Sequence, residues 1–300
     1  MSVERPPRGG LSGIEEGSAR RGEVRGLAGG RLHRISYREW GDPTGRRVVV
    51  CVHALTRTGR DFGPLAAALV RTPGTRVVAP DMPGRGASER LHDPMLYQIP
   101  TYVADAVTLL ARIDVEEVDW VGISMGALIG MAIGAMPDSP VRRLVISDAG
   151  PVIERAALDR IAGYVGVETL FDSREAAAAA IRSVSAPFGP HTDAEWEFLV
   201  DSVLVRRDDG RWTLHYDPAI GVPIRASLSG SAPDLWPLWD AIRAPTLVLR
   251  GERSDLLSAA TAQAMSVRGP RARVVTLPGV GHAPTLVPAA QVALVSDFLA

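Results

Sequence analysis

The chain has one cysteine, no lysine and almost no net charge. Cys51 alone cannot form an intrachain disulfide, so nothing in the sequence requires an oxidising compartment, and we expect this thiol to be a small buried apolar group. All 33 basic residues are arginine, and 34 acidic residues bring the formal net charge to −1. This balance leaves no excess of positive charge that would indicate nucleic-acid binding.

Long apolar runs are also missing. No stretch approaches the roughly eighteen apolar residues that a membrane span needs, and the N-terminus carries no apolar signal segment. The 300 residues are 46% hydrophobic, which is enough to fill one large core. We therefore expect a soluble protein with no membrane contact, cytoplasmic by default. The sequence does not encode its oligomeric state.

The most informative segment is residues 122–126, Gly-Ile-Ser-Met-Gly. It lies between a strand-like run, residues 118–123, and a helix-like run, residues 127–136. A sharp strand-to-helix turn exposes a serine hydroxyl but crowds the backbone, so small residues are needed two positions before and after it. The alternative is an ordinary helix N-cap, which the paired glycines disfavour. Ser124 is thus the predicted nucleophile.

Two partners for this serine follow later in the chain, each after a strand-like run. Residues 245–250 precede a turn that carries Asp255, and residues 273–277 precede a glycine-flanked loop that carries His282. The order serine, acid, histidine is that of one group of serine hydrolases. We predict that His282 is the base and that Asp255 orients it.

The acid has competing interpretations. Asp255 is also well placed to be the N-cap of a helix that begins near Leu256. Asp148 follows a different strand-like run, residues 144–148, and is a rival for the same role. Asp255 remains the favoured acid at this stage.

From about Leu32 to the C-terminus these residues resemble the α/β-hydrolase superfamily, in particular its bacterial serine esterases with a helical cap. Residues 52–55, Val-His-Ala-Leu, follow a strand-like run where the superfamily usually has His-Gly and an apolar residue. The resemblance implies an oxyanion hole formed by the backbone N–H groups of Leu55 and Met125. Ala54 departs from the usual glycine, so a positive φ there would be costly. His53 matches a family histidine whose role is structural.

Residues 81–88 resemble the superfamily's Asp-x-x-Gly-x-Gly-x-Ser turn, for which we expect a structural role. Arg57, Arg60 and Asp61 follow the oxyanion segment. They are candidates for contact with an anionic substrate, but an exposed ion-pair cluster is the more ordinary interpretation.

The chain divides into three predicted regions. Residues 1–30 lack apolar periodicity and read as a disordered leader. Residues 31–150 and 240–300 alternate strand-like and helix-like runs, which predicts an α/β fold with a mostly parallel sheet and helices on both faces. Residues 151–239 change to helical segments, with a hairpin signal at 209–210, and form the predicted cap. Candidate cap or pocket-wall aromatics, each also explicable as simple packing, are Trp196, Phe198, Trp212, Trp236 and Trp239.

The function that follows is a cofactor-free serine hydrolase, without a metal, that cleaves a small-molecule carboxylic ester, or less readily an amide or lactone, through an acyl-enzyme. One alternative is a carbon–carbon bond hydrolase of the meta-cleavage type. Those enzymes usually resemble Gly-Pro-Gly after the histidine and carry Asn before the serine, whereas residues 55–57 and Ile123 differ here. Another alternative is a ligand-binding or non-hydrolytic protein of the same fold. Acyl length and leaving group cannot be read from the sequence.

Overall fold

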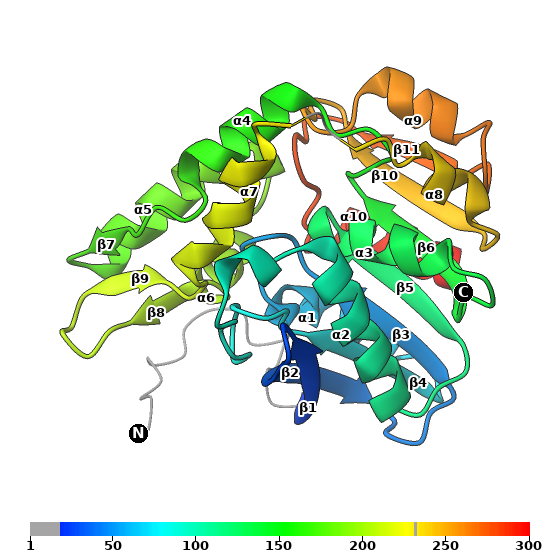
Figure 1. Cartoon of the computed structure of the whole chain (residues 1–300), viewed down its shortest axis with the longest axis horizontal. Coiled ribbons are helices and arrows are strands. Elements are labelled where there is room, and N and C mark those ends of the chain that lie inside the picture. The colour runs from blue at the N-terminus through cyan, green and yellow to red at the C-terminus, as the bar shows by residue number, and fades with distance from the viewer. Residues whose placement is uncertain (1–18, 231–232) are drawn as a thin grey trace.

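The computed structural model describes residues 19–230 and 233–300. An eight-stranded sheet forms its centre, and a smaller group of helices and strands stands over one end of it (Figure 1). The two outermost strands on one side pair antiparallel, and the other six run parallel to one another. In spatial order the strands are β1 (Arg20–Ala28), β2 (Arg31–Gly41), β4 (Thr75–Pro80), β3 (Arg47–Val52), β5 (Val118–Ile123), β6 (Val141–Ser147), β10 (Thr246–Gly251) and β11 (Arg273–Leu277).

Helices cover both faces of this sheet. Strand β3 shows why: Val48 and Val50 belong to one buried cluster, while Val49 and Cys51 belong to the other. Successive side chains of a strand point to opposite faces, so a run with no polar residue must be covered twice. One face carries α2 (Ile99–Arg112), α3 (Met125–Gly134), α8 (Trp236–Ala241) and α9 (Ala259–Met265), and the other carries α1 (Gly63–Leu69) and α10 (Ala289–Leu299). The predicted α/β sheet is confirmed.

The N-terminal strand corrects the prediction of a leader over residues 1–30. Residues 20–28 form β1, which pairs with β2 from Arg20 opposite Glu39 to Ala28 opposite Arg31. The strand escaped notice because it lies at the sheet's edge and buries little, so its sequence is rich in arginine and glycine instead of apolar residues. Residues 1–18 of the predicted leader lie outside the described residues.

The segment between β6 and β10 forms the group of elements that stands over the sheet. Its helices are α4 (Arg155–Tyr164), α5 (Arg174–Val184), α6 (Asp193–Asp201) and α7 (Gly221–Ser227). A three-stranded antiparallel sheet joins them, formed by β7 (Leu170–Phe171), β9 (Trp212–Leu214) and β8 (Leu204–Arg206). After α6 ends at Asp201 the chain enters β8, which pairs with β9 as one arm of the hairpin expected around residues 209–210. We call residues 152–230 the cap.

Candidate active site

The turn from β5 into α3 presents Ser124 in a strained backbone conformation. Its φ is 51° and its ψ is −107°, a region that non-glycine residues rarely adopt. A Cβ on Gly122 would stand 2.2 Å from the carbonyl oxygen of Gly126, and a Cβ on Gly126 would stand 2.0 Å from that of Val52. Both glycines are therefore required by close backbone contact, as the sequence predicted.

The loop after β11 brings His282 to this serine. Oγ of Ser124 lies 2.9 Å from Nε2 of His282, and Nδ1 of His282 lies 2.7 Å from Oδ2 of Asp148. Because the carboxylate can only accept, Nδ1 carries the ring proton and Nε2 is left free to accept from the serine hydroxyl. The three side chains thus form one continuous chain of hydrogen bonds across residues that are far apart in the sequence.

The acid in this chain is Asp148, and the expectation that Asp255 contacts His282 is not met. Both oxygens of Asp255 bind the guanidinium of Arg160 from α4, at 2.5 and 2.8 Å. Partial burial favours the neutral carboxyl, but this ion pair outweighs it and holds the pKa of Asp255 below its usual range. The physical reason is the strand order: β6, which ends just before Asp148, lies between β5 and β10 and so places its end next to Ser124.

Asp148 is fully buried, and each hydrogen-bond partner of its carboxylate is a donor. The backbone N–H of Gly251 donates to Oδ1 at 2.9 Å, and the hydroxyl of Ser254 donates to Oδ2 at 2.6 Å. Together with His282 these donors compensate a buried carboxylate for the water it has lost. The sequence signal for this acid was its position at the end of a strand, the same signal that Asp255 carries.

The backbone N–H groups expected to bind an oxyanion lie in two turns that face the same sheet edge. Met125 is the first residue of α3, so its N–H has no partner within that helix. Leu55 follows β3 inside a turn that the N–H of Arg57 closes by donating to the carbonyl of Ala54 at 3.0 Å. Ala54 is not among the described residues with positive φ, so the substitution of alanine for glycine introduces no left-handed strain.

The side chain of His53 connects this turn to Met82 through two hydrogen bonds. Met82 N–H donates to its Nε2 at 2.9 Å, and its Nδ1–H donates to the carbonyl of Ala54 at 2.7 Å. Burial lowers the pKa of His53 to about 3, so the ring is neutral and is held in one tautomer. These contacts fit the structural role expected of this histidine.

Arg57 and Asp61 are buried, in contrast to the exposed ion-pair cluster that was expected, and Arg60 is partly exposed. The guanidinium of Arg57 binds Asp61 at 2.6 and 2.9 Å and also donates to the carbonyl of Leu199 and the hydroxyl of Ser202 in the cap. Arg60 donates to the carbonyl of Asp201. This cluster joins the oxyanion turn to the end of α6.

The predicted aromatic candidates divide between the cap and the core. Trp196 contacts the ring of His191, whose Nε2 lies 2.8 Å from the hydroxyl of Thr285 on the His282 loop. Trp239 is fully buried in α8, and its indole N–H donates to the carbonyl of Arg268. Trp236 stacks beneath the guanidinium of the same arginine. The two α8 tryptophans therefore pack against the core and do not line the site.

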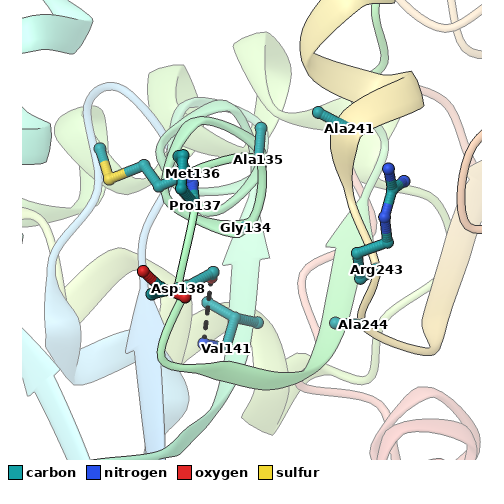
Figure 2. A pocket seen from close by; sticks show the side chains of 10 residues that line it. Gly134, Ala135, Met136, Pro137, Asp138, Val141, Ala241, Arg243 and Ala244 are labelled. Carbon is teal, nitrogen blue, oxygen red and sulfur yellow. Dashed lines mark hydrogen bonds between the residues drawn. The ribbon is translucent and has the colours of Figure 1, made fainter.

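A hollow of about 460 Å³ lies elsewhere, at the amino-terminal ends of the strands (Figure 2). It is bounded by the end of α3, the loop that leads to Val141 at the start of β6, and the segment after α8. Its polar side chains include Asp138 and Arg243, without a histidine or cysteine. Open α/β sheets react at the opposite, carboxyl-terminal edge, where Ser124 stands. The hollow is thus separate from the candidate site.

Within the described ranges 19–230 and 233–300, no group of three histidine, cysteine, aspartate or glutamate side chains is arranged to hold a metal ion. None of the helices described there is long and apolar enough to cross a membrane.

Comparison with known proteins gives a consistent result. Residues 49–294 match the alpha/beta hydrolase family. The chain is 46% identical to the 3-hydroxybutyrate-oligomer hydrolase of Cupriavidus necator, over 94% of this chain and 98% of that one. It is 28% identical to esterase YbfF of Escherichia coli, over 78% and 85%.

Solved structures share the fold over nearly their whole length. An alpha/beta hydrolase from Novosphingobium aromaticivorans superposes with a TM-score of 0.85 at 35% identity, and a hydrolase from Rickettsia typhi with 0.86 at 27%. Each similarity covers 94% of this chain and 98% of the other. The chain belongs to the alpha/beta hydrolase family, and it is an enzyme of the ester-hydrolase class.

Proposed function

We propose that this enzyme hydrolyses the ester bonds of short 3-hydroxybutyrate oligomers through an acyl-enzyme on Ser124. The observation that carries the mechanism is the unbroken hydrogen-bond chain from Ser124 through His282 to Asp148, at 2.9 and 2.7 Å. Support for the substrate comes from the relative in Cupriavidus necator, because its 46% identity extends over nearly the whole of both chains.

The reaction begins when Nε2 of His282 accepts the hydroxyl proton of Ser124 and Oγ attacks the ester carbonyl carbon. Asp148 stabilises the imidazolium that forms. The carbonyl oxygen becomes an oxyanion, for which the N–H groups of Leu55 and Met125 are the proposed donors.

Collapse of this intermediate breaks the bond to the leaving oxygen, which is the 3-hydroxyl of the next unit in the oligomer. His282 returns its proton to that oxygen, so the leaving group departs as a neutral alcohol. Water then attacks the acyl-enzyme with the same base, which frees the 3-hydroxybutyrate carboxyl group and restores Ser124.

The direct test compares wild type with Ser124→Ala on the 3-hydroxybutyrate dimer and trimer and on p-nitrophenyl esters from acetate to laurate. We expect the variant to retain its thermal melting curve while kcat falls by about 10⁴- to 10⁶-fold. Wild-type turnover of p-nitrophenyl esters without cleavage of the dimer or trimer would retain the mechanism and reject the substrate. Undiminished turnover by Ser124→Ala would reject the mechanism itself.

Carbon–carbon bond cleavage is the second candidate. The 2-hydroxymuconate semialdehyde hydrolase of a Pseudomonas strain is 41% identical to this chain, but only over 93 residues, 30% of this chain and 32% of that one. Ester hydrolysis is favoured because the longer similarity points to it. Loss of absorbance by a ring-fission dienoate, without cleavage of any ester, would reverse this preference.

A further inference from the structure

Arg85 is fully buried in the loop after β4, and no acidic side chain forms an ion pair with it among the residues that the structure describes. Taking a guanidinium out of water without a counter-charge is costly, and apolar side chains fill such positions at lower cost. A charge retained under these conditions calls for a physical reason.

Its contacts lie around the proposed oxyanion hole. Nε donates to the carbonyl of Leu55 at 2.8 Å, and Nη2 lies 3.6 Å from Sδ of Met125. Nη1 donates to the carbonyl of Pro83 at 2.7 Å and to the hydroxyl of Tyr102 at 2.8 Å. One planar group thus touches both residues whose N–H groups are the proposed oxyanion donors.

None of the described groups in direct contact with the Arg85 guanidinium carries a negative charge. The guanidinium lies 5.7 Å from the ring centre of Tyr97 and 5.1 Å from that of Tyr102, so the two rings attract it without carrying a negative charge. Burial raises the pKa of both phenols, which keeps them protonated at neutral pH. Beyond these rings, the hydroxyl of Tyr97 donates to the carboxylate of Asp217 at 2.7 Å. The guanidinium therefore has no counter-charge in direct contact, and in a medium of low dielectric constant its field is strong.

We propose that Arg85 is a positioning residue of the oxyanion hole, one that fixes the Leu55 turn against Met125 and places a permanent positive charge behind the developing oxyanion. The inference rests on the proposed acyl-enzyme mechanism at Ser124. Negative charge appears at that place only during the reaction, so the field of Arg85 acts on the transition state more than on the bound ester.

Arg85→Gln tests this, because glutamine keeps a donor but removes the charge. We expect kcat on a p-nitrophenyl ester to fall about 10- to 100-fold while KM stays within about threefold. An alkyl boronic acid, which adds to the serine as a tetrahedral anion, should lose affinity by a similar factor. A purely structural role would instead lower the melting temperature and leave kcat and boronate affinity unchanged, and that result would overturn the proposal.

Arg85→Lys is the second variant, should the glutamine variant fail to fold. Lysine keeps the charge but does not reach all four partners at once, so we expect a smaller loss of kcat, about 3- to 10-fold, again matched by the boronate. Wild-type kcat in this variant would refute the positioning role.

Arg76→Gln is the matched control. Arg76 is also largely buried, but it binds Glu39 and the carbonyl of Ile113 away from the site, so we expect reduced stability with kcat unchanged. Ser124→Ala in the same assay separates the two hypotheses. If turnover does not depend on Ser124, the proposed acyl-enzyme mechanism is wrong. If turnover does depend on Ser124, the Arg85 variants test only the positioning role of Arg85.

Discussion

Two aspartates, Asp148 and Asp255, stand at the carboxyl ends of neighbouring strands near His282. Asp148 is fully buried and contacts Nδ1 of the histidine, whereas the side chain of Asp255 is 42% exposed and paired with Arg160. The difference lies in accessibility and partner and not in residue type. A carboxylate fixed by buried donors holds an imidazole in one orientation, while an exposed one is shared with water and with the cap.

Replacement of each aspartate separates their roles. We expect Asp148→Asn to lower kcat by about 10³- to 10⁴-fold, because the amide no longer holds the tautomer that leaves Nε2 free to accept. Asp255→Asn should change kcat less than tenfold, since it removes only an exposed ion pair with Arg160. Ester hydrolysis measured at saturating substrate distinguishes them. An equal loss in both variants would contradict the assignment of Asp148 as the acid.

At the scale of elements, the turn between β5 and α3 depends on backbone contact more than on side chains. The carbonyl of Val52 at the end of β3 lies against Gly126 so closely that no side chain fits between them. The carbonyl of Gly126 in turn accepts from the indole N–H of Trp120 at 3.0 Å. The turn that carries Ser124 is therefore in close backbone contact with β3, the strand that leads to the turn containing Leu55.

The variant Gly126→Ala tests the importance of this close backbone contact. A Cβ placed 2.0 Å from the Val52 oxygen forces α3 or β3 to shift, and we expect unfolding free energy to fall by about 3 kcal/mol or more, with loss of ester hydrolysis. Gly134→Ala in the same helix is the control, because its nearest neighbour would be an ordinary 3.6 Å contact with Leu144. Urea unfolding of both variants gives the comparison. Equal stability of the two would argue against the close contact.

Across the whole molecule, the cap is attached to the sheet on both sides of the site. The buried Arg57–Asp61 pair joins the oxyanion turn to α6, and the exposed Arg160–Asp255 pair joins α4 to the loop after β10. Buried pairs are costly to break singly, since the remaining charge is left without a partner. Arg57, held by Asp61, also donates to the carbonyl of Leu199 and the hydroxyl of Ser202, so replacing it removes buried hydrogen bonds to the cap as well as the ion pair.

Arg57→Met should lower the free energy of unfolding by about 3 kcal/mol and increase hydrogen exchange in α6 and β8, because it leaves Asp61 as an uncompensated buried charge. The double variant Arg57→Met with Asp61→Leu should recover much of the stability. Arg155→Ala serves as the control, because its exposed pair with Asp159 contributes little. Unchanged exchange in the cap of Arg57→Met would show that other contacts hold it.

Much of this architecture was predictable because the local pattern of apolar residues and glycines in the sequence indicates strands and turns. The mostly apolar residues 118–123 indicated a strand buried on both faces, and Gly122 and Gly126 indicated a crowded turn after it. Ser124 and His282 followed from the same reasoning, since each stands beside glycines at the end of a strand. Strand β1 was not predicted, because an edge strand needs few apolar residues and so lacks the apolar pattern of a buried strand.

The sequence by itself determined the fold class, the nucleophile turn and the histidine loop, because each is indicated by a local pattern of apolar residues and glycines. Only the tertiary structure decided which aspartate meets His282, because that choice depends on β6 lying between β5 and β10 and on Arg160 of the cap binding Asp255. The burial of Arg57 and Arg85 was likewise decided there. Asp61 was recognisable as a partner of Arg57 from its spacing, but the carbonyl groups of Leu55 and Leu199 and the side chains of Tyr102 and Ser202 are brought to these arginines only by the fold.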